Sequence, residues 1–283
     1  MSVQGISGVK TTWQAPPKEP TAEDFRLAAI LEAASNGANH ELAALIEVDH
    51  HRAYAAAYAA PHHMNLAHAL IGSADDPIFV HELAIIESAL EGREEALKVL
   101  IETEYHLAVA IAWLTPKYKD LADRLLADAE NQETVSKMAT AVAAFDGRQE
   151  ALDVFIATNE YNRGVAIPWT IPHYKGIANK LFAEAVNPES TREIAIQNAA
   201  LNGRQEALKM LIQTDAHRAL AILYAAPNHM ELAATLLNSA ANPVRVHELA
   251  LSMAHLNGWQ DLADALAELN KPFAPLQSPR IMG

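Results

Sequence analysis

The chain has 283 residues, 51% of them hydrophobic, and its 21 basic and 35 acidic side chains give a net charge of -14. This apolar content excludes disorder of the whole chain, and the lack of cysteine excludes disulfides, thiolate metal sites and a thiol nucleophile. The negative charge disfavours nucleic acid and anionic membranes as partners, because phosphate groups are bound by Lys and Arg. Abundant alanine and few aromatic residues favour closely packed helices.

The N-terminal segment, residues 1–20, contains Pro16, Pro17 and Pro20 and no apolar period, so a disordered lead is predicted there. The chain shows neither a signal-peptide pattern nor an apolar run of about 18 residues. A soluble protein is therefore expected, in the cytoplasm or, if the chain is a secreted bacterial effector, in the cytosol of a host. The first helix is expected over residues 21–36.

A glycine-led segment then recurs along the chain. Gly92-Arg-Glu-Glu-Ala-Leu, Gly147-Arg-Gln-Glu-Ala-Leu and Gly203-Arg-Gln-Glu-Ala-Leu are nearly identical, and weaker copies begin at Gly37 and Gly258. The intervals between these five glycines are 55, 55, 56 and 55 residues. Four repeat units therefore cover residues 37–257. The extra residue of the third unit is predicted to lie near Gly164.

Two further markers keep the same period. A proline follows each of the first four glycines after 24 or 25 residues, and an Asp or Asn follows after 39 or 40. Asx followed by Pro suits a helix start, because the side chain accepts a hydrogen bond at the N-cap and proline lacks an N–H at N1. The prolines are Pro61, Pro116, Pro172 and Pro227, and the Asx residues are Asp76, Asn131, Asn187 and Asn242.

Apolar residues between the markers recur at helical spacing, which predicts four short helices in each unit and no strands. The helices begin after the glycine, after a predicted cap, after the proline and after the Asx residue. Each glycine is predicted to end the preceding helix in the left-handed conformation, so that the chain turns back on itself. The caps predicted for the second helix of each unit are Asp49, Glu104, Asn159 and Asp215.

Each unit thus holds two antiparallel hairpins, one closed by a glycine turn and one by a proline turn. With a leading helix at 21–36 and a closing helix at 258–269, the pattern gives 18 helices in nine hairpins. A chain of hairpins that contact only their neighbours is an α-solenoid. The predicted fold is therefore all-α: a single right-handed solenoid of stacked hairpins over residues 21–269, followed by an extended tail over residues 270–283.

The glycine hairpins resemble ankyrin repeats. Val246-His-Glu-Leu-Ala-Leu-Ser-Met-Ala-His-Leu-Asn-Gly258-Trp-Gln-Asp-Leu-Ala-Asp-Ala-Leu266 has the ankyrin order of His, a Leu-Ala helix, Asn-Gly and a second helix. The proline hairpin over residues 219–237 is similar, with Pro227 in place of the glycine. The resemblance implies an ankyrin-like solenoid. The Thr-Pro-Leu-His tetrad is missing, however, and no β-hairpin fingers are predicted.

The string Gly-Arg-Gln-Glu-Ala-Leu also resembles, more faintly, the second helix of the DNA-reading repeats of TAL effectors. Those repeats are cationic where they face DNA, whereas Glu91 and Asp146 occupy the turns of this chain. Nucleic-acid binding is therefore the third of three hypotheses for function.

Histidines provide a second hypothesis, an enzyme or a metal site in residues 50–68. Adjacent histidines on a helix point about 100° apart, whereas zinc ligands on a helix usually stand at i and i+4. Several of the 13 histidines share repeat positions, which predicts a surface or loop-capping role instead. No nucleophile elbow, phosphate-binding loop or catalytic triad stands out, and no cofactor is predicted. The histidines concerned are His50, His51, His62, His63 and His68, and the repeat mates of His51 are His106 and His217.

An aromatic ladder favours the first hypothesis, a protein-binding surface. Ring residues recur three residues before each turn proline and two residues after it, and such rings often dominate binding at interfaces. The alternative is that each ring fills the space between neighbouring hairpins. The outer units carry Tyr, His and Met at these places, and the inner units Trp, Tyr and Lys. The eight predicted binding residues are Tyr58, Trp113, Trp169 and Tyr224 before the proline, and His63, Tyr118, Tyr174 and His229 after it.

These observations predict a non-enzymatic scaffold that binds another protein along the proline-turn edge. The charge of the chain indicates a partner with a neutral or basic surface. The oligomeric state is left open.

Overall fold

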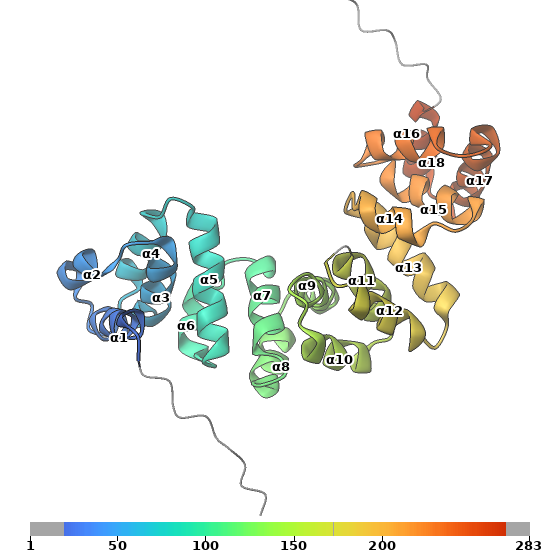
Figure 1. Ribbon diagram of the computed structural model, residues 1–283. Coiled ribbons are helices and arrows are strands. Elements are labelled where there is room, and N and C mark those ends of the chain that lie inside the picture. The colour runs from blue at the N-terminus through green and yellow to red at the C-terminus, as the bar shows by residue number, and fades with distance from the viewer. Residues whose placement is uncertain (1–19, 172, 270–283) are drawn as a thin grey trace, which may run out of the picture. The chain divides into compact units, whose positions relative to one another are not determined.

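The computed structural model describes residues 20–171 and 173–269, and within these ranges the chain forms 18 α-helices and no strand (Figure 1). The predicted all-α class and the number of helices are confirmed for this part of the chain. The predicted lead, apart from Pro20, and the predicted tail lie outside the described residues. None of the described helices is long and apolar enough to cross a lipid bilayer.

Odd-numbered and even-numbered helices have different roles in the packing. The odd-numbered helices are α1 (Ala22–Ser35), α3 (Asp49–Ala59), α5 (Pro77–Leu90), α7 (Glu104–Leu114), α9 (Gln132–Phe145), α11 (Tyr161–Thr170), α13 (Pro188–Leu201), α15 (Asp215–Ala225) and α17 (Pro243–Leu256). The even-numbered helices are α2 (Asn39–Leu45), α4 (Met64–Gly72), α6 (Glu94–Leu100), α8 (Lys119–Ala127), α10 (Gln149–Thr158), α12 (Lys175–Ala183), α14 (Gln205–Leu211), α16 (Met230–Asn238) and α18 (Gln260–Leu269).

The chain divides into two compact units, residues 1–84 and 85–283. In the first, α1 packs against α2 and α3, and α3 packs against α4. In the second, each odd-numbered helix from α7 to α15 packs against the next odd-numbered helix and against the even-numbered helix that follows it. Each unit therefore stacks antiparallel hairpins as an α-solenoid does, with an inner layer of odd-numbered helices. A single solenoid over residues 21–269 stays a prediction.

Small side chains fill the core between the inner helices. Ala55, Ala56 and Ala57 of α3 are fully buried, and so are Ala110 and Ala112 of α7. Because alanine projects little from the helix surface, neighbouring axes can approach to the short end of the usual range of about 8–10 Å. The alanine-rich composition thus gives a thin, closely packed layer of helices.

The predicted glycine turns are confirmed. All five marker glycines have φ between 63° and 70°, a conformation that only glycine adopts without strain. At the third marker, the N–H of Arg148 donates to the carbonyl of Ala143 at 2.8 Å, and the N–H of Gly147 donates to Ala144 at 3.2 Å. This pair of bonds satisfies the free carbonyls at the end of α9 and turns the chain into α10.

The predicted Asx caps are also confirmed. The side chains of Asn131, Asn187 and Asn242 accept hydrogen bonds from the backbone N–H three residues further on, at 3.0–3.2 Å. Asp76 accepts in the same way from the N–H of Phe79 at 3.1 Å. The N1 position of α13 and α17 is proline, which has no N–H to satisfy.

The caps predicted for α3, α7 and α15 are wrong by one residue. Asp49, Glu104 and Asp215 are the first helical residues, and the caps before them are Val48, Thr103 and Thr214. The hydroxyls of Thr103 and Thr214 each accept from the N–H three residues on at 3.1 Å. Thr and Asp cap helices with similar preference, so the sequence did not decide between Thr214 and Asp215. The fourth predicted cap is also wrong by one residue, because the residue at the N-cap of α11 is Glu160, although Asn159 accepts a hydrogen bond from the N–H of Tyr161 at 3.0 Å.

The extra residue of the third unit lies before Asn162, not near Gly164. Helix α10 has 10 residues, three more than α14. The one-residue offset of the third unit from the fourth is already present in the first turn of α11. Arg163 then donates to the carbonyl of Leu181, 18 residues ahead, as Arg218 donates to Leu236. Gly164 instead stands where the other units have alanine, and a Cβ there would lie 2.4 Å from Cγ2 of Ile194.

Candidate protein-binding surface at the turns

Glycine turns and proline turns lie side by side along one edge of the second unit. This adjacency is visible in the rings of the proline turns, which cover the turn glycines. A Cβ built on Gly92 or Gly147 would lie 2.6–2.7 Å from ring atoms of Tyr118 or Tyr174. We call this edge the turn edge. In residues 85–269 it carries Gly92, Tyr118, Gly147, Tyr174, Gly203 and His229, and in the first unit Gly37 and His63 form the same pair.

In the outer repeat units the covering ring is an imidazole that also forms a hydrogen bond. Nε2–H of His63 donates to the carbonyl of Ser35 at 3.1 Å, and Nε2–H of His229 donates to Leu201 at 3.0 Å. Each accepting carbonyl lies two residues before the turn glycine. The ring therefore holds the end of the preceding inner helix as well as covering the glycine, and glycine is required both for its φ and for this close approach.

The second row of rings lies under arginines of the following hairpin. The guanidinium of Arg148 stands 4.1 Å from the centre of the Trp113 ring, and that of Arg204 stands 4.3 Å from the centre of Trp169. Nη2 of Arg148 also donates to the carbonyl of Thr115 at 3.0 Å. Burial lowers the pKa of both guanidinium groups from its usual value, yet both remain cationic at neutral pH.

Tyrosines complete this row with aromatic partners. The ring of Tyr224 lies 5.7 Å from that of Trp259, which occupies the repeat position of the arginines. In the first unit Tyr58 lies 5.0 Å from Tyr54. Every ring predicted to bind thus contacts a neighbouring side chain or turn. All eight are half-buried except Tyr174, which is 37% exposed. Packing between hairpins is confirmed for most of them, and binding stays a prediction.

A row of exposed apolar side chains on the same edge was missed by the sequence reasoning. Each member ends an inner helix, two residues before the turn glycine. Phe145 is 50% exposed, and its ring meets the edge of Trp169 with centroids 6.5 Å apart. The periodicity was visible in the sequence, but nothing there told an exposed position from a core one. The row, named here the apolar row, is Leu90, Phe145, Leu201 and Leu256, exposed by 37%, 50%, 39% and 85%.

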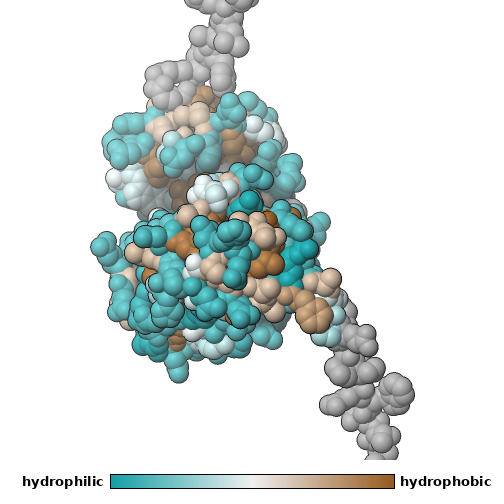
Figure 2. Space-filling view, turned by 90° about the vertical axis from the view of Figure 1, so that its left-hand side faces the viewer, coloured by the Kyte–Doolittle hydropathy of each residue, from teal (hydrophilic) through white to brown (hydrophobic). Residues whose placement is uncertain are grey.

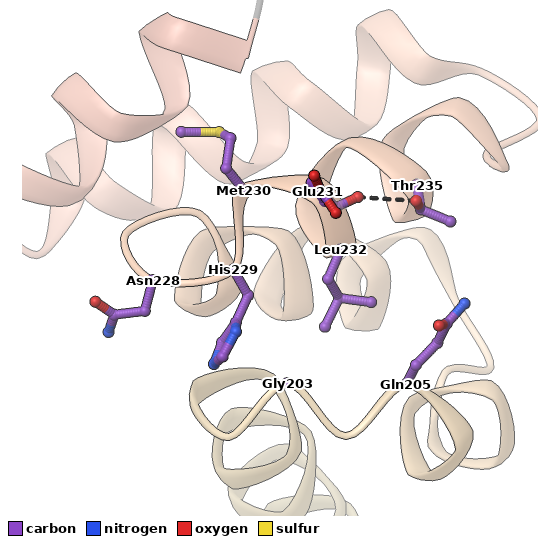
Figure 3. A pocket seen from close by; sticks show the side chains of 8 residues that line it. All are labelled: Gly203, Gln205, Asn228, His229, Met230, Glu231, Leu232 and Thr235. Carbon is purple, nitrogen blue, oxygen red and sulfur yellow. Dashed lines mark hydrogen bonds between the residues drawn. The ribbon is translucent and has the colours of Figure 1, made fainter.

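Two hollows open beside the histidines of the outer units. The hollow of about 440 Å³ in the fourth unit lies between the proline turn at 228–232 and the glycine turn at 203–205. Figure 3 shows the side chains of His229 and Leu232 pointing toward the glycine turn, while Met230 points away. An equivalent hollow of about 510 Å³ lies beside His63 and Gly37 in the first unit. The outer units, where His and Met replace Tyr and Lys, thus share a hollow beside the histidine as well as these residue types.

Of the histidines singled out for a metal site, His51 is buried and held by other contacts. Nδ1 of the buried His51 accepts from the N–H of Glu47 at 3.2 Å, and its Nε2–H donates to Glu23 at 2.8 Å. His217 repeats this arrangement with Gln213 and Glu189. The predicted loop-capping role is confirmed for these two residues. His50, His62 and His68 are exposed.

The surface of the first unit is acidic and polar. Residues 20–84 contain nine Asp or Glu against Arg26 and Arg52 alone as Arg or Lys. On the face drawn in Figure 2, hydrophilic residues predominate and apolar ones form small separate groups. The apolar row, in contrast, lies in the second unit.

Comparison with protein-family models, with curated proteins and with solved structures finds no match for this chain.

Proposed function

We propose that the chain is a non-enzymatic scaffold that binds a partner protein through the turn edge of its second unit. The observation that carries the proposal is the apolar row, in which Phe145, Leu201 and Leu256 stay exposed at one repeat position. Apolar side chains that gather at the surface beside aromatic rings are typical of protein-binding sites. Side chains needed only for packing would be covered by the neighbouring hairpin.

The hairpins closed by a glycine turn are compatible with ankyrin-like repeats. An inner helix ends at a left-handed glycine, and a short outer helix returns against it, as in α13, Gly203 and α14. Repeat proteins of this kind use extended surfaces that several repeats build together. The repeated turn edge is such a surface.

The rings give the turn edge its shape. Trp113 and Trp169 lie half-buried under Arg148 and Arg204, so truncating them to Ala is expected to lower stability as well as any binding. Loss of a well-packed Trp costs about 3–5 kcal/mol when buried, and less at this exposure. The exposed apolar row therefore gives a cleaner test of binding than the rings do.

The test compares two sets of variants in affinity capture from the native cell or a host cell. Phe145→Ser, Leu201→Ser and Leu256→Ser remove the apolar row. Val186→Ser and Val244→Ser are matched controls, because these valines are more than two-thirds exposed and lie just before α13 and at the start of α17, at the ends of these helices opposite to Leu201 and Leu256. We expect a protein that the wild type and both controls retain to be lost from the apolar-row variants. Retention by all variants alike would contradict the proposal.

A further inference from the structure

Resting on the proposed function, we infer that the partner inserts a lysine side chain at the turn edge of the third repeat unit. Its ammonium group would lie between the carbonyl of Phe145, the ring of Tyr174 and the carboxylate of Asp146. We call these three groups the ammonium site. The inference follows from the second repeat unit, in which a lysine of the chain itself occupies the equivalent place.

Lys117 is the lysine at this place in the second repeat unit. Its Nζ donates to the carbonyl of Leu90 at 3.1 Å and stands 4.8 Å from the centre of the Tyr118 ring. The hydroxyl of Tyr118, and to a smaller extent the carboxylate of Glu91, raise the pKa of this ammonium group against the opposing effect of desolvation. A carbonyl at a helix end, an aromatic ring and a carboxylate thus act together on one cation.

The third repeat unit has the same groups at the same positions, but His173 replaces the lysine. Tyr174 covers its glycine with the same three ring atoms as Tyr118 does, all within 3.0 Å of a Cβ built there. The ring of His173 lies beside that of Tyr174, with centroids 6.5 Å apart. Within residues 20–171 and 173–269, no group donates a hydrogen bond to the carbonyl of Phe145. The donors to the equivalent carbonyls of the other three units are His63, Lys117 and His229.

Three cations also stand near the ammonium site. Arg148 and Arg204 each lie against an indole ring and donate to a backbone carbonyl, and Lys175 is the first residue of α12. Because Lys117 is held in the second unit with cations at the same repeat positions, these three do not exclude an ammonium group from the third. The residues at these positions around Lys117 are Arg93, Arg148 and Lys119.

The third repeat unit has fewer carboxylates than the second. Gln149 and Gly176 stand where the second unit has Glu94 and Asp120. A lysine in the ammonium site is therefore held mainly by the carbonyl, the ring and Asp146. We expect this contact to be reversible, as the contact between a scaffold and its partner is.

Titration of the full-length protein with two small probes tests the inference. Nα-acetyl-lysine methylamide carries the ammonium group, and Nα-acetyl-norleucine methylamide has the same carbon stem without it. Amide NMR spectra follow both titrations. We expect the lysine probe to shift the signals of Asp146, Gly147 and Tyr174 until they saturate, and the norleucine probe to bind about tenfold more weakly.

Two variants and a matched control locate the binding. His173→Lys places a lysine of the chain at the ammonium site, so the probe should bind about tenfold more weakly while the urea midpoint stays unchanged. Asp146→Asn removes the carboxylate and should weaken binding about threefold. Asn228→Lys is the control for His173→Lys. It adds the same charge at the same repeat position of the fourth unit, where His229 already donates to the carbonyl of Leu201, and should bind the probe as the wild type does.

The outcomes separate this inference from the proposed function. The absence of saturable shifts at the three signals, or equal binding by His173→Lys and Asn228→Lys, would overturn the ammonium site. In affinity capture, we expect the partner to be lost from His173→Lys and retained by Asn228→Lys. A partner that is lost from Phe145→Ser but retained by His173→Lys would overturn the lysine and leave the proposed function standing. Retention by both Phe145→Ser and His173→Lys would overturn the two proposals together.

Discussion

The third and fourth repeat units place different rings at the same two positions. Tyr174 covers Gly147 in the third unit, and His229 covers Gly203 in the fourth. Both rings lie against the glycine, but only the imidazole donates a hydrogen bond, to the carbonyl of Leu201. The shared contact shows that the position demands a flat ring, and that its chemistry can vary.

The same lesson holds for the row of rings before the proline. In the third unit Trp169 lies under the guanidinium of Arg204, whereas in the fourth Tyr224 lies against the indole of Trp259. A flat cation and an aromatic ring thus occupy equivalent places. The difference between inner and outer units therefore does not by itself indicate binding, because packing between hairpins accepts both solutions.

The connection between the first and second helices of the repeat differs more between the third and fourth units. In the fourth unit the N–H of Gln213 donates to Nδ1 of His217. In the third unit, which has one more residue, Nδ2 of Asn162 donates to the carbonyl of Phe155. Both side chains are buried, and they stabilise the same connection with opposite roles: His217 accepts the hydrogen bond, whereas Asn162 donates it.

The largest effect is expected from alanine at the turn glycines. Gly147→Ala and Gly203→Ala each place a side chain at positive φ, which costs about 1–2 kcal/mol, and drive a Cβ into the covering ring. We expect a total loss of about 2–4 kcal/mol in the free energy of unfolding, measured by urea titration. Gly258→Ala is the matched control, because its φ is 70° but no described atom lies within 4 Å of the added Cβ.

The ring contact can be isolated further. Gly203→Ala in a His229→Ala background is expected to cost no more than Gly258→Ala, because the ring is gone. Equal losses for Gly147→Ala, Gly203→Ala and Gly258→Ala would show that backbone strain alone makes glycine necessary at the turns.

A smaller effect is expected at the stacked position. Arg204→Ala removes the contact with Trp169 and the hydrogen bond to Ile171, for an expected loss of about 1–2 kcal/mol in urea unfolding. Trp259→Arg makes the fourth unit like the third, and we expect the stability to change by less than about 1 kcal/mol. A larger loss for Trp259→Arg than for Arg204→Ala would refute the equivalence of the two solutions.

The next effect on stability is expected from His217 and Asn162, in the connections before α15 and α11. His217→Ala removes an acceptor for the N–H of Gln213 and a donor to Glu189, and we expect a loss of about 1–2 kcal/mol. Asn162→Ala removes one hydrogen bond, to Phe155, and is expected to cost about 1 kcal/mol. Thermal unfolding of both variants measures the difference. If Asn162→Ala proves more damaging, the longer connection of the third unit depends on its side chain more than the fourth does.

The features that the sequence predicted correctly are those that recur in each repeat and have a local physical cause. Gly147 and Gly203 at positive φ, and Asn187 and Asn242 at helix starts, follow from conformational preferences that act over a few residues. The repeat period then predicted the hairpins and the packing between them.

What the sequence did not predict depends on which way a helix faces. Phe145 and Leu201 follow the apolar period as core residues do, and only the packing of the neighbouring hairpins leaves them exposed. The stacking of Arg204 on Trp169 joins residues 35 apart, a distance that no local preference encodes. The extra residue was predicted near Gly164, but the glycine at this position is explained by the close approach of Ile194 and not by an insertion.

The smallest effect concerns the residue before the turn glycine, which is Asp146 in one unit and Asn202 in the next. Partial withdrawal from water raises the pKa of the Asp146 carboxyl, against the opposing charge of Arg148. A raised pKa in the folded state means that this group favours folding below the ordinary Asp value near 4, and that this contribution is lost as the pH rises through the folded pKa. Asp146→Asn is therefore expected to raise the urea midpoint slightly at pH 7, and the gain should vanish as the pH falls toward 4. The reverse exchange, Asn202→Asp, should lower the midpoint at pH 7 and recover in acid. A lower midpoint for Asp146→Asn at pH 7 would mean that contacts of the carboxylate outweigh its desolvation.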